Sequence, residues 1–139
     1  MLTPKKVKYR KWQSSRTDMR KVTPDTRGTA ISFGAFGLKA TSGGRIRANQ
    51  IEAARKVCSR TIGKTGRMWT RVFPDRPVTQ KAAEVPMGKG KGEPKGFCLE
   101  VRPGRILFEV DGVTEEVAKS ALIKAGKKLP VTIRVVGRE

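Results

Sequence analysis

The stretch RILFEVDGVTEEVAKSALIKAGKKLPVTIRVV, residues 105–136, decides the fold class. It opens with the alternating pattern of a strand over 105–112 and closes with a second strand pattern over 130–136. Between them, 114–129 has the apolar spacing of an amphipathic helix that Thr114 can cap. We expect the core face of this helix to consist of Val117, Ala121, Leu122 and Ala125. A strand, a helix and a strand in one short stretch predict that one domain contains both element types.

Three further segments have strand patterns. GFCLEVR at 96–102 comes just before the quoted stretch, and the Pro103-Gly104 dipeptide predicts that it pairs with 105–112 as an antiparallel hairpin. RMWTRVF at 67–73 alternates as a strand does. The apolar run at 29–42 contains glycines that indicate a bend or a close backbone approach.

Residues 47–64 form the clearest helix. Its apolar face consists of Ile51, Ala54, Cys58 and Ile62. The opposite face carries Lys56, Arg60 and Lys64, and Glu52 is the segment's only acid. Because a solvated helix face usually mixes both signs of charge, this cationic stripe favours a face directed at phosphates.

The net charge limits what the chain can bind. There are 31 Lys and Arg against 12 Asp and Glu, which gives +19 at neutral pH, and there is no histidine. Such a charge favours contact with a polyanion, because neutralised phosphates release their counterions. We therefore expect a nucleic-acid partner.

Catalytic, metal and cofactor sites are not expected. Without histidine, catalysis would need clustered carboxylates, a cysteine or a metal, yet the acids are scattered. Glu109 and Asp111 lie on a predicted strand edge, where pairing with arginine explains them. Cys58 and Cys98 are isolated, which predicts reduced, packed thiols. We recognise no signal peptide or membrane span, and expect a soluble protein of the cytosol or an organelle matrix.

Residues 1–28 predict an extended basic arm ahead of a globular domain at 29–139. Pro4 and Pro24 disfavour a helix in the arm. Trp12 lies among its cations, as a stacking residue would beside an unpaired base. We assign RNA binding to this tryptophan and to the cations Lys5, Lys6, Lys8, Arg10, Lys11, Arg16, Arg20, Lys21, Arg45, Arg47, Lys56, Arg60 and Lys64.

The segment VTQKAAEVPMGKGKGEPKG, residues 78–96, is expected to protrude as a loop. Its glycines and lysines, with almost no apolar content, cannot anchor it in a core. Over 87–92 glycine alternates with other residues, and glycine lets the backbone approach an anion closely. Composition alone leaves two interpretations open, a functional loop and a disordered one.

Sequence blocks over nearly the whole chain carry a resemblance to a known family. They are MLTPKKVKYRK at 1–11, SFGAFGLKA at 32–40, IRANQIEAAR at 46–55, GRMWTRVFPDRPVTQKAAEVPMGKGKG at 66–92, RPGRILFEVDGVTEE at 102–116 and KLPV at 128–131. The most specific block runs from RVFPD to MGKGKG. In these blocks the chain resembles the bacterial-type large-subunit ribosomal protein sixteen family, which is related to the archaeal and eukaryotic ten-e family.

The resemblance implies an α+β fold of the α/β-hammerhead type and a structural role on large-subunit rRNA. It places the protein at the aminoacyl-tRNA (A) site near the peptidyl-transferase centre, with the arm running through rRNA and a part in late subunit assembly. The tRNA-proximal residues it implies are Lys81, Met87, Gly88, Lys89, Gly90, Lys91 and Gly92.

The implied partners are large-subunit rRNA, A-site tRNA and neighbouring large-subunit proteins, with P-site tRNA as a second candidate. No membrane contact, cofactor or homo-oligomer is expected. The implied location is the cytoplasm, ribosome-bound, with an organellar ribosome as the other setting.

Two features depart from the family pattern. Pro86 stands where bacterial members usually carry arginine, hydroxylated in some, so that contact and that modification are absent here. Residues 12–28 lack the usual glycine-rich character, so the resemblance does not define the path of the arm there. The alternative interpretation of the charge is a free basic RNA chaperone, which a high-salt wash would release from the large subunit.

Overall fold

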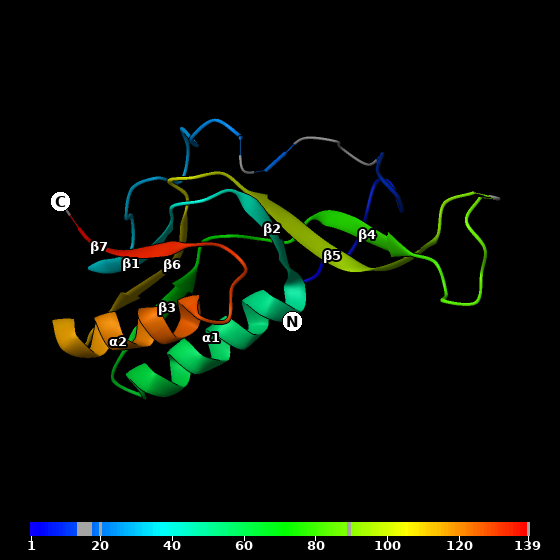
Figure 1. Cartoon of the computed structure of the whole chain (residues 1–139). Helices are drawn as coiled ribbons and strands as arrows, with labels where there is room; N and C mark the ends of the chain where they lie inside the picture. Colours follow the sequence, from blue (N-terminus) through cyan, green and yellow to red (C-terminus); the bar gives the residue numbers. More distant parts are fainter. Residues whose placement is uncertain (14–17, 20, 89, 139) are drawn as a thin grey trace.

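The computed structural model describes residues 1–13, 18–19, 21–88 and 90–138. Within these ranges the chain folds into two helices and two antiparallel sheets in one domain, which confirms the α+β class (Figure 1). The elements are β1 (Phe36–Ala40), β2 (Gly44–Arg47), α1 (Ala48–Ile62), β3 (Arg67–Thr70), β4 (Arg76–Gln80), β5 (Glu93–Val101), β6 (Ile106–Asp111), α2 (Glu115–Gly126) and β7 (Ile133–Gly137).

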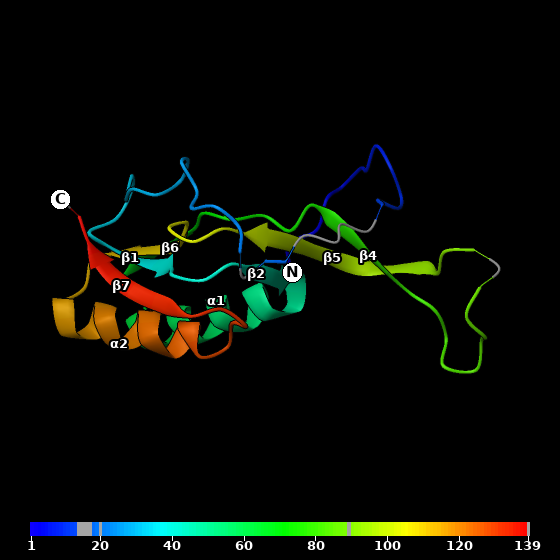
Figure 2. The same cartoon turned by 45° about the horizontal axis from the view of Figure 1, so that its top comes forward.

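The hydrophobic core lies between the helices and one sheet. The strand order is β3-β6-β1-β7 in the larger sheet and β2-β5-β4 in the smaller one. α1 and α2 pack against each other and cover one face of the larger sheet (Figures 1 and 2). The completely buried side chains of this layer include Leu38, Ala54, Cys58, Phe108, Val110, Ala118, Ala121, Leu122 and Ala125.

The predicted hairpin of 96–102 with 105–112 is wrong. A turn does form, with Gly104 at φ +98°, but β5 and β6 belong to different sheets. Each already has antiparallel neighbours on both sides: β2 and β4 flank β5, while β1 and β3 flank β6. The Pro103-Gly104 turn therefore leads the chain from one sheet into the other.

Both predicted helices form, but the predicted core face of α2 contains one error. α1 buries the four predicted apolar residues, and Gly63 ends it at φ +68° with its N–H bonded to the Ser59 carbonyl at 3.1 Å. In α2 the Thr114 hydroxyl accepts from the Val117 N–H at 3.5 Å, as expected for a cap. The Val117 side chain, however, is exposed, and Ala118 lies in the core. One residue rotates a helix by about 100°, which turns Val117 away from the buried stripe.

Two strands, β2 and β4, were not foreseen, and β4 shortens the predicted loop. β4 pairs with β5 from Arg76↔Cys98 to Gln80↔Glu93, so only residues 81–92 lie beyond the paired strands. β2 pairs with the other edge of β5. The sequence did not predict β4, because proline at position 77 disfavours a strand. Proline is tolerated there because β4 is an edge strand. The β4–β5 hairpin extends well away from the rest of the domain (Figure 2).

Of the two features that the glycines of 29–42 indicated, a bend or a close backbone approach, the close approach is confirmed at Gly34. A Cβ on Gly34 would lie 2.7 Å from the Val110 carbonyl oxygen, so only glycine fits without a shift. The Ala35 N–H bonds to the same carbonyl at 3.1 Å. The regular strand is shorter than the 29–42 expected, because residues before Phe36 leave the β1 ladder and cross the sheet.

Candidate nucleic-acid interface

The arm is anchored at its start and at its end. The N-terminal amine lies 3.9 Å from the Glu52 carboxylate on α1, and Leu2 packs against the core. At the other end, Asp25 pairs with Arg105 at 3.2 Å, and the Gly28 carbonyl accepts from the Ile106 N–H at 2.7 Å. Burial raises the pKa of Asp25, but hydrogen bonds from the Arg27 backbone and the Arg105 side chain bring it below its ordinary value. These anchors fix the two ends of the arm on the domain.

The middle of the arm docks on the β4–β5 hairpin. Lys11 Nζ donates to the Lys91 carbonyl at 3.2 Å, and Lys91 Nζ donates back to the Trp12 carbonyl. Arg10 lies 3.5 Å from Glu93. Arm and hairpin, predicted as separate cationic surfaces, therefore form one.

Trp12 lies beside a charged cluster that joins the three strands of the smaller sheet. The Arg76 guanidinium is 5.6 Å from the Trp12 ring centroid and donates to the Gln13 carbonyl at 3.1 Å. The same guanidinium pairs with Glu100 at 2.9 Å, and Arg45 pairs with Glu100 at 3.2 Å. Trp12 is 40% exposed, so part of its ring stays open to a ligand. Sequence reasoning did not single out Arg76, because its partner Glu100 is distant in sequence.

The remaining predicted cations lie at the surface. Lys5, Lys6, Lys8, Arg10 and Lys21 are exposed, and Lys8 Nζ lies 5.6 Å from the Tyr9 ring centroid. Arg16, Arg20 and Lys89, also named above, lie outside the described residues.

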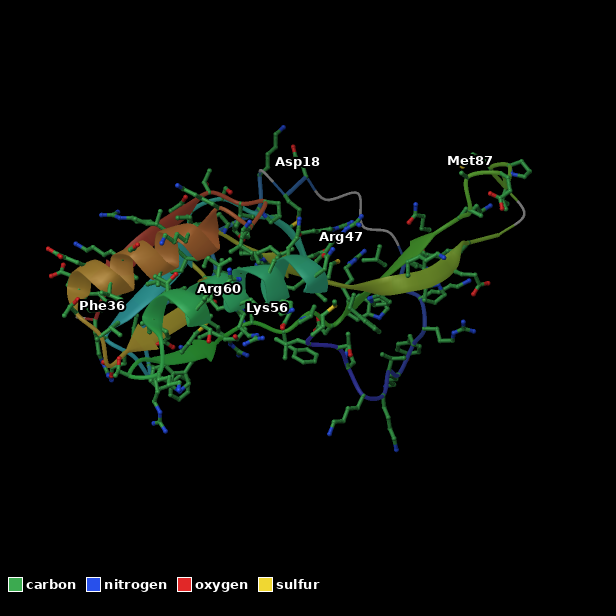
Figure 3. The ribbon with its side chains drawn as sticks, turned by 90° about the horizontal axis from the view of Figure 1, so that it is seen from below. Asp18, Phe36, Arg47, Lys56, Arg60 and Met87 are labelled. Atoms are coloured by element: carbon green, nitrogen blue, oxygen red, sulfur yellow. The ribbon has the colours of Figure 1, made fainter. Side chains whose placement is uncertain are left out.

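The cationic stripe of α1 is exposed as predicted. Figure 3 shows Arg47 at the start of α1 and Lys56 and Arg60 farther along it; Lys64 follows just beyond the helix. Lys56 of the stripe contributes less to the electrostatics of Glu52, whose carboxylate pairs mainly with Arg55 at 2.7 Å. That hydrogen bond lowers the pKa of Glu52 and keeps it ionised.

A groove of about 400 Å³ lies where the arm, the start of α1 and the hairpin meet. It is lined by the start of the arm, the start of α1 and both strands of the hairpin, including Met1, Thr3, Arg47, Asn49 and Lys95. Two cations, Arg47 and Lys95, therefore face the same concavity. Lys95 was not among the predicted site residues, because the sequence placed it in the loop 78–96 and not in a strand beside the arm.

The predicted tRNA-proximal residues lie in the loop at the hairpin tip. Met87 is 94% exposed and occupies the far end of the molecule from α2 (Figure 3). Gly88 and Gly90 have φ of +102° and +101°, which disfavours any residue with a Cβ. Lys81 donates to the Gly88 carbonyl across the loop. Gly92 lies at the loop base, where a Cβ would meet the Gln80 backbone at 2.7 Å.

The two cysteines are packed thiols, as predicted. Both are free and buried, and burial raises the pKa of Cys58 to about 11. Across the described ranges, no three His, Cys, Asp or Glu side chains gather as a metal site would require. No helix in those ranges is long and apolar enough to cross a membrane.

Comparison with known proteins gives a similarity over almost the entire chain. A family model described as ribosomal protein L16p/L10e matches residues 4–136. Two relatives, each named large ribosomal subunit protein uL16, come from Rickettsia bellii strains OSU 85-389 and RML369-C. Each is 52% identical over 136 residues, which cover 98% of this chain and 97% of the relative. The similarity therefore spans the arm, both sheets and the hairpin alike.

Proposed function

Because the chain belongs to the ribosomal protein L16p/L10e family, we propose that its arm, α1 and hairpin bind rRNA phosphates at the A site. The protein is a structural, non-enzymatic component of the large ribosomal subunit, where it associates with rRNA and neighbouring ribosomal proteins. The proposal adds which surfaces make the RNA contacts and which one faces tRNA.

The docking of the arm on the hairpin carries the proposal. Lys11 and Lys91 reach across this junction to backbone carbonyls, which are neutral, so these contacts fix the two side chains without cancelling their charge. The acids at this contact are Glu93, which lies near Arg10 with its side chain 76% exposed, and Glu100, which pairs with Arg76 and Arg45. Because surface ion pairs in water contribute little, the junction keeps a net positive charge available for phosphates.

The hairpin tip is the part that we assign to tRNA. It projects beyond the domain, so it can reach a ligand while the arm and α1 stay on rRNA. At Gly88 and Gly90 the backbone N–H groups are not shielded by side chains, which favours close approach to an anion. Pro86 leaves this tip without the arginine of bacterial relatives, so here its charge comes from lysines. We assign the A-site tRNA as its ligand, with P-site tRNA as the second.

Salt dependence of RNA binding tests the phosphate contacts. We expect replacement of Lys5, Lys6 and Lys8 by Gln in the full chain to flatten the plot of log affinity against log salt. Each lost phosphate contact should reduce the slope by about 0.7–0.9 on a large-subunit rRNA fragment.

The matched control replaces Lys124, Lys127 and Lys128, which are exposed at the end of α2. It removes the same charge from the far side of the domain, and we expect a smaller change in slope. Equal changes in both triple variants would show that only net charge matters and would refute the assignment of surfaces. Release of the protein from large subunits in a high-salt wash would instead favour the free RNA chaperone.

A further inference from the structure

The segment 32–34 crosses the face of the larger sheet that the helices leave uncovered. Trp69 on β3 and Gly37 on β1 are both paired in register with Glu109 on β6, so these three residues point to the same face. Phe108 and Val110, the neighbours of Glu109, point to the opposite face and pack in the core. Figures 1 and 2 show the chain leading into β1 on the side of the sheet away from α1 and α2.

Glu109 holds this segment on the sheet. The residue was expected at a strand edge, but β6 is an inner strand and Glu109 is completely buried. Its Oε1 accepts the backbone N–H groups of Ser32 at 2.8 Å, Phe33 at 3.0 Å and Gly34 at 3.2 Å. Its Oε2 accepts from Arg71 Nη1 at 2.6 Å. Four donors on one buried carboxylate fix the backbone of three consecutive residues.

The side chain presented by this fixed backbone points into solvent. Phe33 is 54% exposed, although its ring stacks on Trp69 with centroids 6.0 Å apart and planes 21° apart. The Arg71 guanidinium carbon lies 5.1 Å from the Phe33 ring centroid. A rigidly held aromatic ring that stays more than half exposed is organised for a contact that the isolated chain does not make.

From this arrangement we infer that Phe33 and Trp69 form a stacking site for an unpaired nucleobase of RNA. Aromatic faces stack on any base and contribute affinity without requiring a particular sequence. Arg71 is a positioning residue, because its charge is matched by Glu109 and its guanidinium lies over the Phe33 ring.

The charges around the site favour RNA over an apolar protein partner. Arg138 is exposed and donates to the Ser32 carbonyl at 3.4 Å, and Arg67 is exposed two residues before Trp69 on the same face of β3. Both can meet the phosphates that flank a stacked base. The inference rests on the proposed function, and adds to the arm, α1 and hairpin a contact that does not depend on charge.

Fluorescence of Trp69 gives a direct test. The chain has two tryptophans, so Trp12→Phe leaves Trp69 as the only one. We expect an oligouridylate to quench Trp69 emission and a blunt-ended RNA duplex, which exposes no unpaired base, to leave it unchanged. Equal quenching by both RNAs, or by neither, would overturn the inference.

Substitution of Phe33 gives a second test in the full chain. Phe33→Leu should weaken oligouridylate binding by roughly five- to a hundred-fold, the loss typical of one stacked base, with no change in the salt slope. Phe33→Tyr, which keeps a stacking face, should bind as the unsubstituted chain does. The matched control is Phe73→Leu, because Phe73 is 44% exposed and lies on the segment that follows β3.

The outcomes separate this inference from the proposed function. Unchanged affinity of Phe33→Leu together with a steep salt slope would refute the stacking site and assign the exposed ring to a protein contact. A flat salt slope of the unsubstituted chain would refute the phosphate contacts, whatever Phe33 does. Circular dichroism of each variant shows whether it is folded, and the Trp69 quenching test applies even if Phe33→Leu is not.

Discussion

Replacement of Glu109 by Gln tests whether one buried carboxylate fixes the segment 32–34 on the sheet. Glutamine has nearly the same volume and keeps one carbonyl oxygen for the backbone N–H groups. It also places an NH2 donor where Oε2 accepts from Arg71 at 2.6 Å. The substitution therefore removes the ion pair and leaves two donors facing each other.

The expected loss of stability follows from the burial of the pair. Removing one partner of a buried ion pair costs about 3–5 kcal/mol, because the other charge stays desolvated. The Arg71 side chain is 21% exposed, so water can solvate part of the unpaired guanidinium. We therefore expect the lower end, about 3 kcal/mol at neutral pH. In a domain of this size that lowers Tm by roughly 10 °C.

The pKa of Glu109 determines how the stability difference between the two proteins should change with pH. Burial raises the pKa of Glu109, but the hydrogen bonds from Arg71, Phe33, Gly34 and Ser32 bring it below its ordinary value of 4.5. A carboxyl group with a lowered folded pKa stabilises the fold above its unfolded pKa. That stabilisation is lost as pH falls through the folded pKa. The difference between the two proteins should therefore be full at neutral pH and shrink below pH 4.5.

Urea unfolding followed by circular dichroism measures this difference at each pH. The control is Glu100→Gln, the same chemical change at a side chain that is 34% exposed and pairs with Arg45 and Arg76. We expect it to cost less than about 1 kcal/mol, because water screens that cluster. A Glu109→Gln loss no larger than that of Glu100→Gln, or a loss that stays constant down to acidic pH, would refute the account of Glu109.

Three further predictions concern other parts of the chain. Gly34→Ala should destabilise the fold by about 1–3 kcal/mol in thermal denaturation, because its Cβ would lie 2.7 Å from the Val110 carbonyl. The control is Gly137→Ala, whose Cβ would have its nearest contact at 4.0 Å and which should cost less. Equal losses of stability in the two variants would contradict this prediction. Replacing Lys89 and Lys91 by Ala should weaken A-site tRNA binding more than subunit assembly, measured by filter binding and sedimentation; stalled assembly with normal tRNA binding would reverse the assignment. Cys58 should react with iodoacetamide at pH about 8 only after unfolding, because burial raises its pKa to about 11. Mass spectrometry follows the reaction, and rapid alkylation of the native thiol would contradict its packing.

The helices could be predicted from sequence because their signals are local. The apolar spacing of α1, its exposed cations and its glycine stop all lie within one segment, and the structure places each as expected. The same method failed at Val117, where two adjacent apolar residues allow two positions of the helix face and only packing against the sheet selects Ala118.

Strand pairing could not be predicted, because it depends on partners far away in sequence. Pro103-Gly104 correctly indicated a turn, but the order of strands around β5 and β6 is set by β2, β4, β1 and β3. The predicted position of Glu109 at a strand edge was wrong for the same reason. An alternating strand pattern puts it on the face away from the core, and nothing nearby in sequence shows that residues 32–34 return to cover that face.

Three arginines of this chain hold partly buried carboxylates, a structural role that we expect to be distinct from RNA binding by the exposed lysines of the arm. Arg71, Arg76 and Arg105 each hold a carboxylate at 2.6–3.2 Å, with side chains no more than 34% exposed. A planar guanidinium suits such partly buried pairs, whereas the strongly hydrated ammonium of lysine does not. Lys5, Lys6 and Lys8 of the arm are exposed, and we predict that they bind phosphates.

The consequence can be tested on pairs of variants. Arg76→Lys keeps the charge but loses the fork that meets Glu100 and the plane that lies beside Trp12, so it should lower stability and leave the salt slope of RNA binding unchanged. Lys5→Gln should do the reverse, lowering the slope by about 0.7–0.9 with little effect on unfolding. If both variants changed stability and salt slope together, the anchoring and binding roles would not be divided between Arg76 and Lys5.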